Sequence, residues 1–374
     1  MPFCFSPWTN IDVSPQGTLS PCCKFQLKHY PERYNLQTHD LDDYVRSDFL
    51  RSIREQFQQD QWPAGCERCQ IEEHNNIKSK RELDYQRWQQ HYQNVDLDSD
   101  QFVTASIAFG NTCNLKCITC NSMASSKWHR EYLDVYGVDH RPVHFYRKNF
   151  VDDFVSQVPN LVHLDIPGGE PLLSGVSEQT QLLQHYIDSG RAGEISLHYT
   201  TNATLFPDQS WLDLWKQFKH VDIQLSIDGV GARYQYIRYP AQWAELEINV
   251  AKYVELEKQH KNLQLSVSHT VSAYNIFYIP EFLDWCDNVG LPKPWMGRVH
   301  NPTHMRPEVW CDSAKQLIRQ KLISDHRPEC QSWAQILDRP GNNLFDQFVE
   351  YLHKHDAARG LNFSQIFPEL AEFV

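Results

Sequence analysis

The chain has 374 residues, enough to bury a full core in one large domain with an appendage, or in two to three domains. Charged residues make up 22% and aromatic residues 13% of the sequence, a composition typical of globular proteins. The formal net charge of -12, from 35 basic and 47 acidic residues, would repel a phosphate backbone, so general nucleic-acid binding is not favoured.

The sequence carries no obvious membrane or export signal. It has no stretch of about 18 apolar residues, and its start lacks the charged and apolar regions of a signal peptide. We therefore expect no membrane association and a cytoplasmic location. Disulfides poorly explain the eleven cysteines, because cytosolic thiols stay reduced. Eight of these cysteines stand in groupings typical of metal sites, which iron-sulfur chemistry explains better.

The first 100 residues are predicted to be mostly loops. Residues 15–17, Pro-Gln-Gly, predict a turn. A helix is expected from about Ser47, because Phe49, Ile53 and Phe57 follow at the spacing of one helical face. This pattern is typical of a small module stapled by a metal.

Five cysteines fall in this part of the chain: Cys4, Cys22, Cys23, Cys66 and Cys69. Cys22 ends a G-x4-C run that begins at Gly17, and the last two form a CxxC pair. Four thiolates can hold either a zinc ion or an iron-sulfur cluster, and CxxC pairs serve both. The sequence therefore leaves the metal of this set open.

From about residue 102 a strand-helix alternation begins. The expected strands are 102–109, 161–166, 194–200, 221–227, 263–271 and 295–300. Helical patterns lie between them. Six such units predict an α/β fold with a parallel sheet and outer helices. A partial (β/α)6 TIM-like barrel is the form that the family resemblance of the motifs below implies.

One face of each expected strand is polar, whereas parallel strands covered on both faces usually read as continuous apolar runs. The polar faces carry His163 and Asp165; Ser196, His198, Thr200 and Asn202; Asp222, Gln224, Ser226 and Asp228; and Ser266, Ser268 and Thr270. If the sheet curves, these faces line a polar lumen able to hold a ligand. The alternative is a solvated sheet face, which flanking helices disfavour.

The strongest signal follows the first expected strand, where Cys113, Cys117 and Cys120 form a CxxxCxxC array. Zinc sites and ferredoxin clusters normally use four protein ligands, so three clustered cysteines indicate an iron-sulfur cluster with one open iron. The loop falls at the face where α/β barrels carry their active sites. A structural zinc site completed by a distant residue is the alternative.

Polar motifs also follow the next strands. Gly168 and Gly169 let the backbone approach a ligand closely, and the Glu170 carboxylate can accept hydrogen bonds from an ammonium group. Further candidates for cofactor contacts are Thr200, Asn202, Ser226, Asp228 and Arg238.

The CxxxCxxC array of Cys113, Cys117 and Cys120, together with the GGEP motif at 168–171, resembles the signature of the radical S-adenosylmethionine (SAM) enzymes. The resemblance implies that the three cysteines hold a [4Fe-4S] cluster whose open iron chelates SAM. One electron then cleaves SAM to a 5'-deoxyadenosyl radical. The chain departs from the family at Thr119, where an aromatic residue usually meets the adenine.

The same resemblance implies roles for the other candidates. The motif at 168–170 would hold the SAM amino group, and Ser226 and Arg238 would hold its carboxylate. Thr200 and Asn202 would contact the ribose side.

The N-terminal cysteine set resembles the half-SPASM or twitch module, in which a cysteine, a G-x4-C hairpin and later cysteines hold an auxiliary iron-sulfur cluster. In many relatives this module follows the barrel, whereas here it comes first. The resemblance implies Cys4, Cys22, Cys66 and Cys69 as ligands, with Cys23 as the spare thiol. A tetrathiolate zinc site is the alternative.

Taken together, the resemblance divides the chain into four parts. These are an auxiliary iron-sulfur module (1–75), a helical linker (76–101), a radical SAM core barrel (102–300) and a helical C-terminal extension (301–374). An apolar stripe in the extension is expected to dock on the core: Phe363, Phe367, Leu370 and Phe373.

The resemblance implies an enzyme that cleaves SAM and abstracts a hydrogen atom from a peptide side chain or a small metabolite. The auxiliary cluster would assist electron transfer or substrate binding, and a flavodoxin- or ferredoxin-type protein would donate the electron. A SAM-binding iron-sulfur sensor or scaffold without turnover stays open, but it needs no polar lumen. A zinc-binding interaction protein also stays open, although it fits neither the acidic charge nor the GGEP motif.

Overall fold

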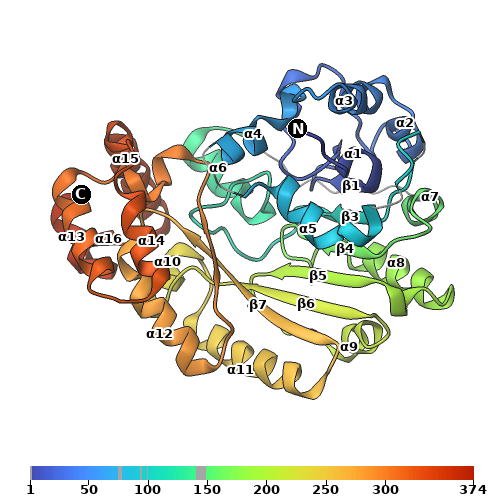
Figure 1. Cartoon of the computed structure of the whole chain (residues 1–374). Helices are drawn as coiled ribbons and strands as arrows, with labels where there is room; N and C mark the ends of the chain where they lie inside the picture. The colour runs from blue at the N-terminus through green and yellow to red at the C-terminus, as the bar shows by residue number, and fades with distance from the viewer. Residues whose placement is uncertain (1, 75–77, 93–94, 99, 140–148) are drawn as a thin grey trace. The chain divides into compact units, whose positions relative to one another are not determined.

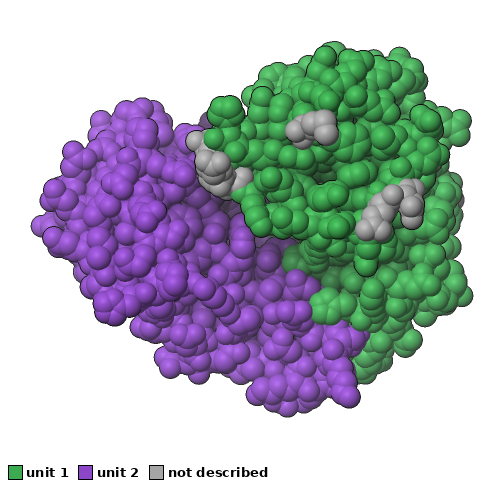
Figure 2. All heavy atoms as spheres, in the orientation of Figure 1, with its two compact units in different colours: residues 1–112, 143–199, 208–221 green, residues 113–142, 200–207, 222–374 purple. Residues whose placement is uncertain are grey.

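The computed structural model describes residues 2–74, 78–92, 95–98, 100–139 and 149–374. It has an α/β architecture (Figure 1) and divides into two compact units (Figure 2). Unit 1 comprises Met1–Thr112, Val143–Tyr199 and Asp208–Val221, and unit 2 comprises Cys113–Pro142, Thr200–Pro207 and Asp222–Val374. The strand order is β2-β1-β3-β4-β5-β6-β7-β8.

Unit 1 contains the first four strands and the start of the fifth. Strands β1 (Asn10–Val13) and β2 (Leu19–Ser20) form an antiparallel hairpin. Strand β1 also pairs in parallel with β3 (Thr104–Ile107), which pairs with β4 (His163–Ile166), which pairs with β5 (Ser196–Thr201). Sequence analysis had not assigned β1 to the sheet, so the N-terminal segment extends the sheet as well as carrying cysteines.

The helices of unit 1 are α1 (Ser6–Thr9), α2 (Leu41–Val45), α3 (Asp48–Gln58), α4 (Glu67–His74), α5 (Lys80–Tyr92), α7 (Phe150–Gln157), α8 (Val176–Asp188) and α9 (Gln209–Trp215). Helix α3 is the one expected near Ser47, whose hydroxyl caps it by accepting the N–H of Leu50. Phe49, Ile53 and Phe57 are buried as their spacing predicted.

Unit 2 contains the end of β6 (His220–Ser226), then β7 (Leu263–Val271), with β8 (Trp295–Arg298) parallel to it. Its helices are α6 (His129–Tyr136), α10 (Gly231–Ile237), α11 (Trp243–Gln259), α12 (Ile279–Val289), α13 (Asp312–Ile323), α14 (Pro328–Ile336), α15 (Phe345–Arg359) and α16 (Phe363–Ile366). No helix in the described parts of the chain has the length and apolar character needed to cross a membrane.

The predicted fold class, α/β with parallel strands and a helical C-terminal segment, is confirmed. Strand β7 has the predicted bounds, and the other five expected strands begin and end within two residues of their predicted limits. Along β5, β6 and β7 the apolar side chains are buried while the alternate, mostly polar ones are partly exposed. The two-residue alternation in the sequence therefore marks two different faces of the sheet.

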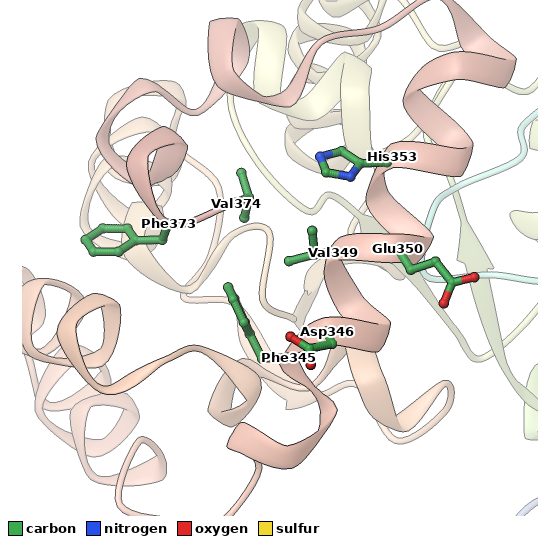
Figure 3. Close-up of a pocket in the computed structure, with 7 residues that line it drawn as sticks. All are labelled: Phe345, Asp346, Val349, Glu350, His353, Phe373 and Val374. Atoms are coloured by element: carbon green, nitrogen blue, oxygen red, sulfur yellow. The ribbon is translucent and has the colours of Figure 1, made fainter.

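The C-terminal segment packs into the core of unit 2. Phe363, Phe367 and Leu370 are buried there, and Phe373 packs against them while partly exposed. Phe373 and Val374 also line a surface pocket of about 440 Å³ beside α15 (Figure 3). The tail docks through its apolar stripe, as expected.

The compact units cut across the boundaries drawn from the sequence. The N-terminal segment shares unit 1 with β3 and β4, whereas the loop after β3 belongs to unit 2. The boundaries at residues 75, 101 and 300 stay predictions.

Candidate cofactor site

The triad of Cys113, Cys117 and Cys120 lies on the loop after β3, and hydrogen bonds within unit 2 fix this loop. The N–H of Lys116 donates to the carbonyl of Tyr239 at 2.7 Å. The indole N–H of Trp128 donates to the carbonyl of Cys117 at 3.2 Å. Because backbone atoms between the cysteines are held, their side chains start from defined positions.

The environment of the triad thiols fits a bound cluster. Burial raises the pKa of Cys117, as do Cys120 and Cys113, while Arg238 lowers it. Burial, with a smaller contribution from Cys113, raises the pKa of Cys120 to about 11. Buried thiols that repel one another's negative charge ionise readily only when a metal balances that charge. Three such thiols therefore suit an iron-sulfur cluster.

Arg238 and Asp228, both predicted to contact the cofactor, form a buried ion pair. The guanidinium Nη2 lies 2.8 Å from Asp228 Oδ2, and the N–H of Thr270 donates to Asp228 Oδ1 at 2.7 Å. Arg238 Nε is buried and has no hydrogen-bond partner among the residues that the structure describes. Asp228 thus positions Arg238, which keeps one N–H available for a carboxylate.

Asn202 is tied directly to the triad loop. Its amide nitrogen donates to Asn114 Oδ1 at 2.9 Å and lies 3.9 Å from Cys113 Sγ. The Thr204 hydroxyl donates to Asn202 Oδ1 at 2.6 Å and accepts from Asn114 Nδ2 at 2.8 Å. These three side chains form a closed polar ring beside the first cysteine.

The other predicted residues of unit 2 occupy strand ends. Thr200 lies near the end of β5 and Ser226 is the last residue of β6, and both are partly buried. Unit 2 therefore brings Asn202 into contact with the triad loop, while the charges of Arg238 and Asp228 act on the pKa of Cys117.

The glycine motif lies in unit 1, where it packs against the segment before the triad. A Cβ on Gly169 would come within 2.3 Å of the Thr112 carbonyl oxygen, so only glycine fits. The N–H of Glu170 donates to that same oxygen at 2.8 Å. Glu170 is fully buried, and its Oε1 accepts the N–H of Leu172 at 3.2 Å. The carboxylate thus stabilises the turn that carries it.

The N-terminal thiols also lie within electrostatic reach of one another. Burial raises the pKa of Cys22, and the charge of Cys23 and, to a smaller extent, those of Cys4 and Cys66 add to the rise. Burial raises the pKa of Cys66, to which Cys4 and Cys69 contribute. Cys23 is exposed as a residue, but its sulfur faces inward, and burial raises the pKa of this thiol to about 11. The charged neighbours of Cys23 are Lys80 and three aspartates.

Cys4, Cys22, Cys66 and Cys69 as the ligand set and Cys23 as the spare thiol stay predictions. Within the described ranges, no group of three or more His, Cys, Asp or Glu side chains is placed to hold a single metal ion.

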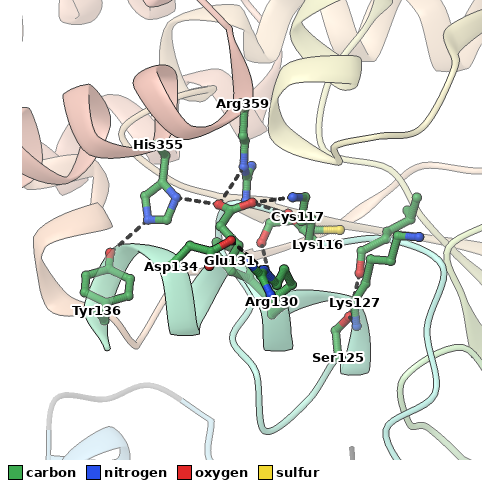
Figure 4. Close-up of polar contacts among 12 residues, drawn as sticks. Lys116, Cys117, Ser125, Lys127, Arg130, Glu131, Asp134, Tyr136, His355 and Arg359 are labelled. Carbon is green, nitrogen blue, oxygen red and sulfur yellow. Dashed lines mark hydrogen bonds and ion pairs between the residues drawn. The ribbon is translucent and has the colours of Figure 1, made fainter. Parts of the chain in front are cut away.

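A charged cluster that the sequence analysis missed supports the triad loop (Figure 4). Glu131, on α6, lies 2.5 Å from Lys116 Nζ and accepts hydrogen bonds from Arg359 Nε at 2.9 Å and His355 Nδ1 at 2.7 Å. Arg359 Nη2 also donates to the carbonyl of Lys116 at 2.9 Å. Helix α15 is thereby connected to the residue just before Cys117.

The cluster around Glu131 is balanced in charge. Burial alone would raise the pKa of Glu131, but the hydrogen bond from His355 and the charges of Arg359 and Lys116 outweigh it and lower the pKa to about 2. Lys116 lies within the CxxxCxxC array, which was the one signal in the sequence that a buried acid would be needed nearby.

Comparison with known proteins identifies the N-terminal part. Residues 4–70 match the model of the SPASM family, an iron-sulfur cluster-binding domain. The match shows that this segment is similar to an iron-sulfur cluster-binding domain. No curated protein matches the sequence.

Solved structures with similar folds include native anSMEcpe with bound AdoMet and Kp18Cys peptide, 17% identical, with a TM-score of 0.44. That match covers 59% of this chain and 59% of anSMEcpe. Streptococcus suis SuiB bound to S-adenosylmethionine is 14% identical with a TM-score of 0.36, covering 96% of this chain and 73% of SuiB. SuiB bound to precursor peptide SuiA matches at 14% identity and a TM-score of 0.36, over 99% and 75%.

Proposed function

We propose that this chain is a radical SAM enzyme that abstracts a hydrogen atom from a peptide side chain or a small metabolite. The observation that carries the proposal is the triad loop of unit 2: three partly buried cysteines on a fixed backbone, beside a buried arginine that keeps one unpaired N–H. When bound, the cluster and SAM would supply the 5'-deoxyadenosyl radical.

In this proposal Cys113, Cys117 and Cys120 hold the cluster, and Arg238 binds the SAM carboxylate through the N–H that Asp228 leaves free. The planar guanidinium suits this task because it can donate to two acceptors at fixed angles. Ser226 would assist Arg238.

The remaining predicted contacts are proposed as follows. The turn at 168–170 would hold the SAM ammonium, with Glu170 acting partly through the turn it stabilises. Thr200 and Asn202 would contact the ribose side, with Asn202 oriented by Asn114.

Cys4, Cys22, Cys66 and Cys69 are proposed to hold the auxiliary cluster, which would assist electron transfer or substrate binding. The SPASM match over residues 4–70 supports an iron-sulfur centre there over zinc. The flavodoxin- or ferredoxin-type electron donor and the cytoplasmic location stay predictions.

The decisive experiment replaces the triad with alanine in the anaerobically reconstituted full chain. Cys113→Ala/Cys117→Ala/Cys120→Ala should lose about four irons and all 5'-deoxyadenosine formation, because one cluster loses every protein ligand. The matched control is Cys311→Ala, a thiol 3.4 Å from Ser313 Oγ that belongs to neither cysteine set. This control should keep its full iron content and still form 5'-deoxyadenosine.

Continued 5'-deoxyadenosine formation by the triple variant would refute the proposal. Wild-type protein that binds SAM with full iron but never forms 5'-deoxyadenosine would instead indicate a sensor or scaffold. A measured zinc content in place of iron would favour the interaction protein.

A further inference from the structure

Unit 1 encloses a polar cavity of about 140 Å³ that none of the proposed cofactor roles uses. Alternate residues of β1, β3, β4 and β5 line one side, and α5 lines the other. The sequence had predicted a polar lumen from His163, Asp165 and His198, and all three line this cavity. Its volume suits one functional group or the end of a side chain rather than a whole cofactor.

The strand register places four polar residues in one row across the cavity. Asp12 pairs with Ser106, Ser106 with Asp165, and Asp165 with His198. Ser20 Oγ donates to Asp12 Oδ1 at 3.1 Å, and Ser106 Oγ donates to Asp165 Oδ2 at 3.2 Å. The row therefore presents two carboxyl groups to the same small space.

The acidic groups of the cavity exceed its available cations. Lys80 Nζ lies 2.7 Å from Asp84 Oδ2, so these two charges neutralise each other. Arg87, at the rim, is exposed. Burial raises the pKa of Asp12 to about 7, even though the charge of Lys80 opposes the rise. Burial also raises the pKa of Asp165. Within the described residues, neither of these two carboxyl groups forms an ion pair with a lysine or arginine, although the more distant charges of Lys80 and Arg87 lower the pKa of Asp165.

Two buried polar atoms lining the cavity also lack hydrogen bonds. Asp165 Oδ1 and His163 Nδ1 have no hydrogen-bond partner within the described ranges of the chain. The imidazole Nε2 of His198 lies 3.9 Å from Asp165 Oδ1, which is beyond hydrogen-bonding distance. His163 is only 7% exposed and packs its ring 4.8 Å from that of Trp88, measured between centroids. Buried polar groups are normally paired, so these atoms indicate a missing ligand.

We propose that this cavity binds the cationic end of the substrate, an ammonium or guanidinium group, between Asp12 and Asp165. Either group brings the positive charge and the several N–H donors that the site lacks. Naming the substrate class in this way rests on the proposed radical SAM function, whereas the binding of a cation to the cavity does not. The occupant would be a lysine- or arginine-like side chain, or the amine end of a small metabolite.

The cavity lies within reach of the turn at 168–170, which follows β4. Asp165 precedes Gly168 by three residues, which corresponds to roughly 10 Å of extended strand. A side chain anchored by its charged end at Asp165 would extend along β4 toward the turn at 168–170. The anchor would therefore fix the position of the substrate's middle carbons relative to that turn.

Calorimetric titration of the reconstituted full chain with three small probes tests the proposal. The probes are Nα-acetyl-lysine amide, the uncharged Nα-acetyl-norleucine amide and the acidic Nα-acetyl-glutamate amide. The lysine probe should bind about tenfold or more tightly than the norleucine probe, because only the ammonium pairs with the carboxylates. Equal affinity for these two, or tighter binding of the glutamate probe, would overturn the proposal.

Asp165→Asn should weaken the binding of the lysine probe by about tenfold or more, because the substitution keeps the shape of the side chain and removes only its charge. Asp12→Asn is the second variant and should act in the same direction. The matched control, Asp152→Asn, removes an exposed carboxylate of α7 in the same unit and should leave the affinity unchanged. If both cavity variants bind the lysine probe as tightly as the wild type, the cation binds elsewhere and the proposal is wrong.

The same preparations are assayed for 5'-deoxyadenosine, so the two proposals fail separately. Lysine binding without SAM cleavage in the wild type would remove the enzyme function and leave the cation site. SAM cleavage without lysine binding would remove the cation site alone.

Discussion

Two regions of the molecule bury carboxyl groups, and they balance the charge in opposite ways. In unit 2, Glu131 is surrounded by Lys116, Arg359 and His355, and its pKa falls to about 2. In unit 1, burial raises the pKa of Asp12 to about 7, because Asp165 adds negative charge and Lys80 is engaged by Asp84. The first site is complete as it stands and acts structurally. The second lacks a cation, and this is the property expected of a binding site.

Removing Glu131 should give the largest effect on stability. Glu131→Ala leaves Lys116 and Arg359 as uncompensated buried charges, which typically costs about 3–5 kcal/mol in free energy of unfolding. Urea denaturation measures the change. The control is Glu350→Ala, which breaks an exposed pair with Lys354 on α15 and should leave the unfolding free energy nearly unchanged.

The same experiment on Asp165 sharpens the contrast. Asp165→Asn should keep or increase the free energy of unfolding, since it removes a buried carboxyl that has no cationic partner at hydrogen-bonding distance. A loss as large as that of Glu131→Ala would show that both regions are structural.

Asp228 is another buried carboxyl group, and a change in Arg238, which forms an ion pair with it, should have an intermediate effect. Arg238→Lys should weaken SAM binding by about 1.5–3 kcal/mol, or roughly one to two decades of affinity, because an ammonium cannot pair with Asp228 and a carboxylate in the same geometry. Equilibrium dialysis on fully reconstituted protein measures it. Arg233→Lys, the same substitution on α10, should leave the affinity for SAM unchanged. An equal loss of affinity in both variants would show that Arg238 does not bind the SAM carboxylate.

The pH dependence of stability should show the smallest effect. Asp12 has a folded-state pKa of about 7 against an ordinary value of 3.8, so between these values the folded state binds the proton more tightly than the unfolded state. Stability from this group therefore rises as pH falls, by about 1 kcal/mol from pH 7 to pH 6. Denaturation midpoints of wild type and Asp12→Asn at pH 6, 7 and 8 would reveal it. Parallel pH profiles of the two proteins would contradict the assignment.

Sequence reasoning located features that depend on neighbouring residues. The strand β7, the helix after Ser47 and the triad loop all follow from short-range periodicity or spacing, which the chain displays directly. The motif at 168–170 was found as well, and the close approach of Gly169 to Thr112 supplies its physical reason.

Features that depend on distant residues were not predictable in this way. Glu131 lies 224 residues before His355, and no local pattern links the two. Strand β1 is only 4 residues long and gains its place by pairing with β3, some 90 residues later. Asp228 and Arg238 were both singled out, but their pairing depends on the path of α10 between them.

The bond between Arg359 and Lys116 also sets an order of events during synthesis. The two residues are 243 positions apart, so a ribosome adding about 5–20 residues per second makes the second partner roughly 12–50 seconds after the first. Until then the loop that carries Cys117 lacks its hydrogen bond to α15. The support of the triad loop is thus completed late in the synthesis of the chain, whereas the N-terminal cysteines emerge early.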